Sequence, residues 1–279
     1  MKKLLILAAI AALTTLPVPA EATGINLLTV PTTVVVTGNI GGTATVSTGA
    51  QLSGTGRFPA FVQIGQPGGS VVGEQAYNTT ANLSTATGGD YNNGSSAVWN
   101  HEITKSDLTA SGGYYTFFLD INEANNSADQ YLSLDQIVIS AGSTANLSTE
   151  TQAPGTIKTI WAMNSLTADL TTNTSTPLVQ HILLNYNNFP GSGWADMVLK
   201  VPTTAFSGVS SGDFIYLFSA FGYLGTTDVA GTPASAIWGQ SDGFEEWAYS
   251  SALVPDGGIT AFMLGLSMLG LGALRRFRR

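Results

Sequence analysis

Residues 194–201 read Trp-Ala-Asp-Met-Val-Leu-Lys-Val, and apolar and polar side chains alternate along them. One face of this segment carries Asp196 and Lys200, and the other carries only apolar side chains (Ala195, Met197, Leu199 and Val201). Successive side chains of a β-strand point to opposite faces, so this alternation is typical of a strand that covers a core with one face. The segment therefore predicts a half-buried strand of an antiparallel sheet.

A second segment repeats the pattern, because Tyr115, Phe117, Leu119 and Ile121 share a face opposite Thr116, Phe118 and Asp120. Nine further segments rich in Val, Ile, Thr and aromatic residues are also predicted as strands, namely 27–36, 43–47, 58–64, 97–103, 136–140, 156–163, 179–185, 214–220 and 244–249. No segment carries the period of an amphipathic helix. We therefore expect an all-β fold, an antiparallel two-sheet sandwich that is jelly-roll-like or immunoglobulin-like.

Residues 23–253 are predicted to form one exported β-sandwich domain, because no repeat or break divides them. Stretches 38–56 and 66–94 are rich in turn-forming residues and are predicted as loops. This part of the chain has four basic residues (Arg57, Lys105, Lys158 and Lys200) against 16 acidic ones, a net charge of −12. Nucleic-acid binding needs a basic surface, so no nucleic-acid partner is expected. The chain has no cysteine, which excludes disulfides and thiol catalysis.

Residues 1–22 have the three parts of a secretory signal peptide. Lys2 and Lys3 precede an apolar run over residues 4–13, and Ala20-Glu21-Ala22 supplies the small residues that signal peptidase requires. Cleavage is expected after Ala22, with Ala20 as the alternative. The expected partners at this stage are signal peptidase and the general secretion machinery.

Residues 254–279 form a second tripartite segment. A short motif (Val254, Pro255, Asp256, Gly257 and Gly258) precedes an uncharged apolar stretch over residues 259–274, and a basic cluster follows it (Arg275, Arg276, Arg278 and Arg279). As a helix, the apolar stretch would be about 24 Å long, close to the thickness of a bilayer core. Arginines at a helix end resist translocation. We therefore expect one C-terminal transmembrane helix retained by the arginines.

This tail resembles the PEP-CTERM sorting signals of Gram-negative bacteria, in the branch whose motif reads Val-Pro-Asp-Ser-Gly. Gly257 departs from that motif, since serine is usual at its position. The resemblance implies that an exosortase, a membrane-embedded transpeptidase, cuts at the motif. It also implies transient anchoring in the inner membrane and delivery to the cell surface or the extracellular matrix.

Oxygen-bearing side chains follow the strand that ends near Ile121. Asp120, Asn122, Glu123, Asn125 and Asp129 lie within ten residues, and calcium binds six to eight oxygens, often from one loop. The segment lacks the glycine and terminal glutamate of an EF-hand, so the alternative is a solvated polar loop. Asp242, Glu245 and Glu246 form a second acidic group, in which strand alternation would separate Glu245 from Glu246.

The chain has few side chains in motifs that are typical of catalytic sites. His101 and His181 are the two histidines, and neither lies in a nucleophile or zinc motif, so both are interpreted as ordinary strand residues. Paired carboxylates would permit glycoside hydrolysis, and aromatic side chains would permit sugar stacking, with Trp238 expected to be the most exposed tryptophan. The leading interpretation is a non-enzymatic exported envelope or matrix protein. A carbohydrate-binding surface module, with extracellular polysaccharide as its partner, is the second alternative, and a glycoside hydrolase is the third.

Overall fold

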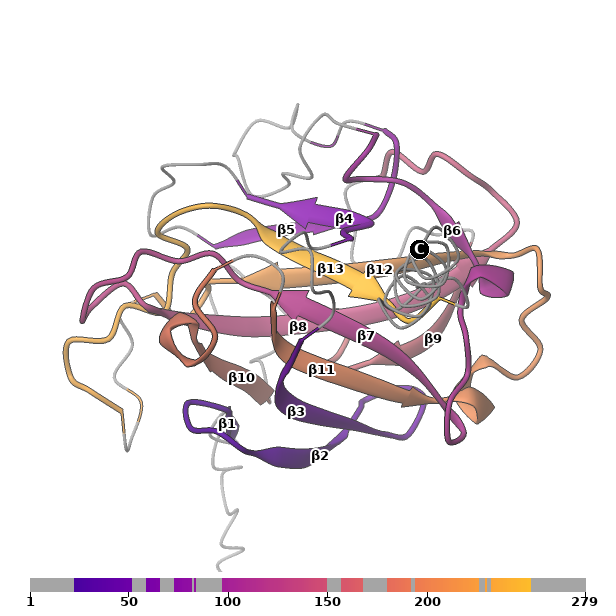
Figure 1. Ribbon diagram of the computed structural model, residues 1–279. Coiled ribbons are helices and arrows are strands. Elements are labelled where there is room, and N and C mark those ends of the chain that lie inside the picture. Colours follow the sequence, from indigo (N-terminus) through magenta and orange to yellow (C-terminus); the bar gives the residue numbers. More distant parts are fainter. Residues whose placement is uncertain are drawn as a thin grey trace, which may run out of the picture.

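The computed structural model describes residues 23–51, 59–65, 73–81, 83, 97–149, 157–167, 180–191, 194–225, 229 and 232–251. These residues form two β-sheets and three short 3-10 helices (Figure 1). The seven-stranded sheet contains β1 (Thr23–Asn26), β5 (Glu74–Tyr77), β6 (Ile103–Thr104), β8 (Tyr131–Gly142), β9 (Lys158–Ala162), β10 (Gln180–Asn185) and β12 (Phe214–Phe221). The six-stranded sheet contains β2 (Thr33–Thr37), β3 (Thr43–Gln51), β4 (Val62–Ile64), β7 (Tyr114–Asp120), β11 (Trp194–Pro202) and β13 (Glu245–Tyr249). The helices are η1 (Lys105–Asp107), η2 (Tyr186–Asn188) and η3 (Thr203–Phe206).

Antiparallel pairing dominates both sheets. The seven-stranded sheet has the path β1-β10-β8-β12-β5, with β6 beside β12 and β9 beside β8, and the six-stranded sheet has the path β2-β3-β11-β7-β13-β4. Among the strands described, β1 and β10 are the one parallel pair. The prediction of an all-β protein with two mainly antiparallel sheets is confirmed.

The strand that begins at Trp194 lies inside the six-stranded sheet. Leu199 lies opposite Val46 of β3 on one side and Phe117 of β7 on the other. Met197, Leu199 and Val201 belong to the buried core, as the alternation predicts. On the opposite face Lys200 is exposed, but Asp196 is only 4% exposed, so this face is not uniformly in contact with solvent.

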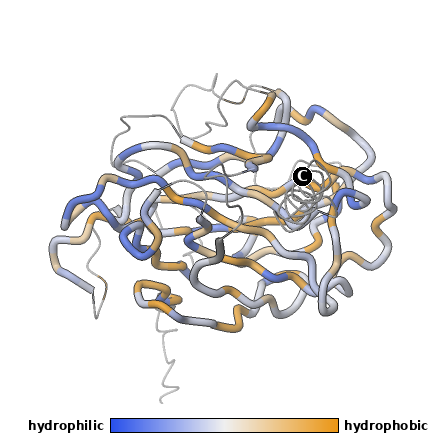
Figure 2. The backbone as a smooth tube through the Cα atoms, in the orientation of Figure 1, coloured by the Kyte–Doolittle hydropathy of each residue, from blue (hydrophilic) through white to orange (hydrophobic). Residues whose placement is uncertain are grey.

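The inward faces of the two sheets share one hydrophobic core. The six-stranded sheet contributes Val46, Phe117 and Trp247, and the seven-stranded sheet contributes Leu134, Ile139 and Leu217. Figure 2 shows the apolar positions recurring along the paired strands. One polar link crosses this core, because Nε1 of Trp247 on β13 donates to Oγ of Ser219 on β12 at 3.0 Å.

The outward face of the seven-stranded sheet is also covered, and this corrects the prediction for Trp238. The chain beyond β12 folds back over β8, where the Ser133 N–H donates to the Trp238 carbonyl at 3.1 Å. Trp238 packs there with Tyr131, Leu183 and Ala236 and is fully buried. Trp194, at 38% exposed, is the tryptophan that reaches solvent.

Several predicted segments differ in extent, and the predicted loop 38–56 contains the strand β3 (Thr43–Gln51). The predicted strand 27–36 is confirmed only from Thr33 onward, as β2, because the chain bends over residues 27–32 and leaves β1 and β2 in different sheets. Within this turn the Thr32 hydroxyl donates to the Thr29 carbonyl, and Pro31 has no N–H for a ladder. Residues 97–100 form a turn, so only Ile103–Thr104 pairs in that region. The predicted loop 66–94 contains β5, which is buried along its whole length.

The sequence segments that concern export lie outside the described residues. They are the signal peptide 1–22, the motif 254–258, the apolar stretch 259–274 and the arginine cluster 275–279. Within the described residues, no helix has the length and apolar character needed to cross a bilayer.

Replacing Trp247 with alanine tests the link between the sheets. It removes a fully buried indole from the shared core, and such deletions cost about 3–5 kcal/mol of unfolding free energy. Ser219→Ala keeps the indole and removes its hydrogen-bond acceptor, which costs about 1–2 kcal/mol. Urea unfolding followed by fluorescence measures both, and equal losses in the two variants would contradict the assignment of Trp247 to the core.

Candidate functional site

The chain leaving β7 and the chain entering β13 lie side by side at one end of the sandwich. Oε2 of Glu123 accepts hydrogen bonds from the Ser241 N–H at 2.8 Å and the Ser241 hydroxyl at 2.6 Å. Nδ2 of Asn122 donates to the Phe244 carbonyl at 2.8 Å. These contacts follow from the antiparallel pairing of β7 with β13, in which Asp120 lies opposite Glu246.

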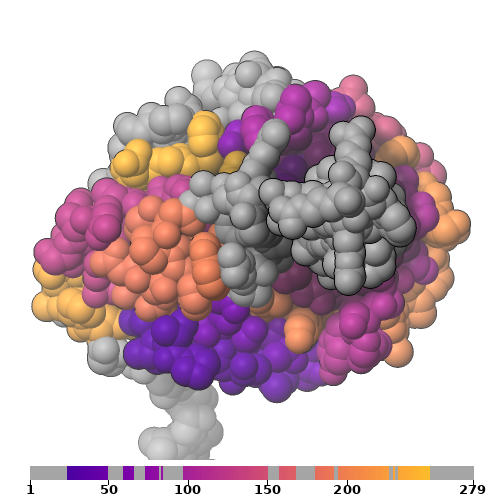
Figure 3. Space-filling model, in the orientation of Figure 1, coloured from indigo at the N-terminus to yellow at the C-terminus, as the bar shows by residue number. Residues whose placement is uncertain are grey.

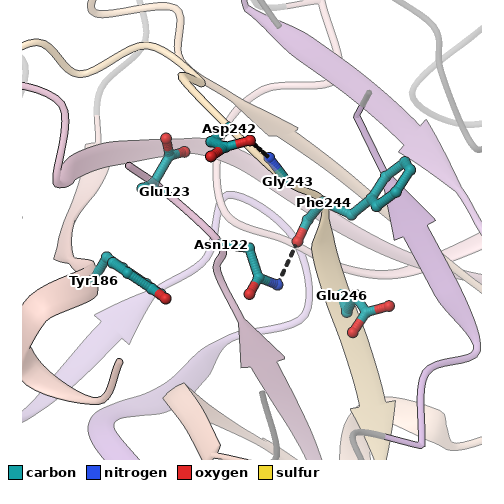
Figure 4. Close-up of a pocket in the computed structure, with 7 residues that line it drawn as sticks. All are labelled: Asn122, Glu123, Tyr186, Asp242, Gly243, Phe244 and Glu246. Carbon is teal, nitrogen blue, oxygen red and sulfur yellow. Dashed lines mark hydrogen bonds between the residues drawn. The ribbon is translucent and has the colours of Figure 1, made fainter. Parts of the chain in front are cut away.

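A pocket of about 310 Å³ opens between these two segments. Its described lining residues are Asn122, Glu123, Tyr186, Asp242, Gly243, Phe244 and Glu246 (Figure 4). Three of them are carboxylic acids and none is basic, and the Tyr186 ring points into the space from η2. The pocket thus presents carboxylate acceptors and an aromatic ring, a combination suited to a polyhydroxylated or cationic group.

Two more glutamates lie behind the floor of the pocket. Glu245 of β13 points inward, because it neighbours the outward Glu246 and pairs with the core residue Ile64. Glu74 enters from β5 of the other sheet. Exposure is 8% for Glu74, 4% for Glu123 and 0% for Glu245, so three buried carboxyls from three separate segments meet here.

Gly65 makes room for this cluster. Its φ is +104°, a left-handed value that favours glycine. A Cβ at this position would lie 2.8 Å from Oε2 of Glu74 and 3.1 Å from Oε2 of Glu245. The two carboxyls therefore face the same point beside the Gly65 backbone, and Nε2 of Gln240 lies 3.5 Å from that point.

Burial raises the pKa of all three carboxyls because it penalises their charged forms. Desolvation raises the pKa of Glu74 to about 7. For Glu123 it raises the pKa to about 8, although the hydrogen bonds from Ser241 act in the opposite direction. The pKa of Glu245 is raised well above its usual value, first by burial and then by repulsion from Glu123 and Glu74.

These shifts explain how the glutamates coexist. Oε1 of Glu123 and both carboxyl oxygens of Glu245 are buried without a hydrogen-bond partner among the described residues. Protonation removes the charge that burial penalises at these oxygens. Two carboxyls that share a site retain a proton far above the normal pKa.

The predicted calcium ligands have separate surroundings. Asp120 is fully buried. On the neighbouring strand β11, burial and then the charge of Asp120 raise the pKa of Asp196. Asn125 is exposed, and Oδ2 of Asp129 accepts a hydrogen bond from Asn126. Asn122 and Glu123 line the pocket. In the part of the chain that the structure describes, no three Asp, Glu, His or Cys side chains are arranged to hold a metal ion.

His181 forms a buried pair with Asp135. Its Nδ1 lies 2.7 Å from Oδ1 of Asp135, and the Ser133 hydroxyl donates to Oδ2 of the same carboxylate at 2.9 Å. Ser133 therefore binds the aspartate and not the imidazole, which is not the order of a catalytic triad. His181 lies on β10 as predicted, whereas His101 lies outside the strands, between a turn and β6.

An aromatic pair lies beside the pocket, with Trp194 exposed and Phe189 half-buried. The rings of Phe189 and Trp194 stack with centroids 5.8 Å apart and an interplanar angle of 18°. The Gly191 N–H, between them in sequence, donates to the Tyr186 hydroxyl at 3.2 Å. Gly49 supports the pair, because a Cβ there would lie 2.0 Å from the Phe189 ring.

Sequence reasoning found part of this site. It identified Glu123 and the acidic group 242–246, and alternation correctly placed Glu245 and Glu246 on opposite faces. It missed Glu74 and Tyr186, since β5 lies in a turn-rich segment and nothing local marks either residue as a neighbour of Glu123.

Comparison with known proteins gives no relative. No family model matches the chain, no curated protein matches it, and no solved structure matches it.

The glutamate cluster predicts a dependence of stability on pH. The folded protein holds protons on Glu74 and Glu123 up to about pH 7 and 8, whereas the unfolded chain releases them near pH 4.5. The folded state therefore binds more protons between these values, so the free energy of unfolding falls as pH rises through that window and then levels off. Because one pKa unit corresponds to about 1.4 kcal/mol, these two shifts set an upper limit of about 7 kcal/mol on the fall between pH 5 and pH 9.

Glu245→Gln should make this fall smaller, because it removes a buried carboxyl whose own pKa is raised by burial and then by repulsion from Glu123 and Glu74. Urea unfolding at several pH values measures it. Asp242→Asn is the matched control, since it removes a carboxylate at the mouth of the same pocket and should leave the slope unchanged. Equal slopes for the wild type and Glu245→Gln would refute the contribution of Glu245 to the pH dependence.

Proposed function

We propose that this chain is an exported, non-enzymatic protein of the cell envelope or extracellular matrix. It is led by a signal peptide (1–22), carries a β-sandwich domain (23–253) and is sorted through its tail (254–279) by an exosortase-type transpeptidase. The observation that carries the proposal is that the folded sandwich occupies the interval between the two expected processing sites.

The strand bounds support this organisation. Every described strand, from β1 at Thr23 to β13 at Tyr249, lies between the expected cleavage site and the motif 254–258. At the other end β13 finishes at Tyr249, so a short spacer precedes Val254. A transpeptidase can reach a motif that lies just outside a folded domain, and Pro255 and the glycine pair disfavour regular structure there.

The chemistry of the interior supports a non-enzymatic role. The His181–Asp135 pair is buried, with His181 only 3% exposed, so this imidazole does not face a substrate. Glu74 and Glu245 lie in the interior near Glu123, and burial raises the pKa of each. The raised pKa values of these two groups thus have a structural explanation.

We propose that the two-sheet sandwich is jelly-roll-like and not immunoglobulin-like. From β10 onward, successive strands alternate between sheets, with β10 and β12 in one and β11 and β13 in the other. In jelly rolls the chain crosses repeatedly from one sheet to the other, whereas in an immunoglobulin sandwich more of the sequential strands lie in the same sheet.

Replacing Pro255 and Asp256 with alanine tests the sorting signal. The variant should remain full-length in the inner membrane, because the transpeptidase loses the residues it reads. Membrane fractionation and immunoblotting follow the processing. Ser250→Ala with Ser251→Ala is the matched control just before the motif, and it should be processed normally. Normal release of the Pro255 and Asp256 variant would eliminate the motif as the signal.

Carbohydrate binding is the second candidate function, and the stacked Phe189–Trp194 pair favours it. Flat exposed aromatic rings bind the apolar faces of sugars, and the neighbouring pocket supplies hydrogen-bond acceptors from Asp242 and Glu246. Polysaccharide of the extracellular matrix is the partner that this arrangement suits.

A glycan array with the full chain tests this second function. Trp194→Ala should weaken any sugar bound by about tenfold or more, because the stacking surface is lost. Val98→Ala removes another exposed apolar side chain (61% exposed) and should leave binding unchanged. Absence of binding to every glycan would reject the module, and turnover of a bound glycan would favour a hydrolase.

A further inference from the structure

The sequence around β2 lacks charge altogether. From Ala22 to Gly56 the chain contains no Asp, Glu, Lys, Arg or His, although the domain as a whole carries a net charge of −12. These residues include β1, β2 and β3, and β2 and β3 form the end of the six-stranded sheet. Figure 3 shows this part of the chain as an indigo band along the lower rim of the molecule.

β2 is an edge strand. Among the described strands only β3 pairs with it, and in Figure 1 it runs along the margin of the sheet. Its Val35 is 65% exposed, and Val30 just before it is 47% exposed. Natural sheets protect such edges with lysine, with proline or with β-bulges. Thr33–Thr37 contains no lysine or proline, and it pairs with β3 in regular register without a bulge.

The hydrogen-bond pattern shows which backbone groups face outward. The Thr48 N–H donates to the Thr32 carbonyl, and Val34 lies opposite Val46. In an antiparallel ladder alternate residues bond to the neighbour, so Val34 and Val36 bond to β3 while Thr33, Val35 and Thr37 point away from it. The Thr37 carbonyl accepts from the Gln180 amide at 2.9 Å. Thr33 and Val35 therefore present their N–H and C=O groups at the edge.

We propose that β2 pairs with β2 of a second copy of this chain, antiparallel about a two-fold axis at Val34. Thr33 of each copy then lies opposite Val35 of the other, and the four outward N–H groups and four outward C=O groups form four hydrogen bonds. The two six-stranded sheets become continuous across the axis.

The distribution of charge favours a second copy of this chain as the partner at the β2 edge. Two domains of net charge −12 repel each other over most of their surfaces, and the uncharged strip around β2 is where they can approach at least cost. A symmetric pairing also needs only one self-complementary edge. The association is independent of the sorting proposal, because it depends on residues 33–35 alone.

Sedimentation of the full-length chain in detergent over a roughly hundredfold concentration range tests the proposal. The wild type should show a monomer–dimer equilibrium. Val35→Lys should weaken the dimer by about tenfold or more, because it places a charge in the paired edge of each copy. Val35→Thr is the matched control, since threonine is uncharged and favours strands, and it should dimerise like the wild type.

Disulfide trapping tests the register. The chain has no cysteine, so a mixture of Thr33→Cys and Val35→Cys chains has one thiol per copy, at positions about 5.5 Å apart across the axis. This mixture should form cross-linked dimers faster than Lys200→Cys, which lies on the exposed face of β11 and away from the edge. A monomer at every concentration, a dimer unaffected by Val35→Lys, or cross-linking no faster than Lys200→Cys would each overturn the proposal.

Discussion

The packing of the two inward sheet faces is the constraint on which the rest of the structure depends. Each strand can offer only every second side chain to that interior, so the register of one strand fixes the register of its neighbours. Leu199, placed between Val46 and Phe117, illustrates this, because a shift of one residue would bring Lys200 into the core. The absence of cysteine leaves hydrophobic burial as the main source of stability.

The same constraint creates the glutamate cluster. β13 must place Trp247 in the core, so the residue two positions earlier, Glu245, also points inward. It reaches the end of the sandwich, where β5 of the opposite sheet brings Glu74 and the segment after β7 brings Glu123. An isolated buried carboxylate is very costly, and protonation reduces this cost. The pocket above Glu123 is therefore backed by groups whose charge depends on pH.

Two parts of the described surface differ in charge. Acidic and amide side chains surround the pocket, whereas the edge formed by β2 has no charge. The aromatic pair Phe189–Trp194 lies near the pocket because η2 directs Tyr186 toward Gly191. Ligand binding and self-association would thus use different parts of the sandwich, and one copy could engage both at the same time.

The sequence alone determined the class of fold and most strands, because alternation and β-branched residues act over a few neighbouring positions. Segments 194–201 and 115–121 were predicted with their inward faces correct, and the segments at both ends of the chain indicated export. Tertiary structure decided the rest. β5 forms because the neighbouring strand β12 pairs with it, against a local preference for turns, and Trp238 is buried because the chain returns over β8. Glu74, Glu123 and Glu245 are distant in sequence, and only the packing of two sheets brings them together.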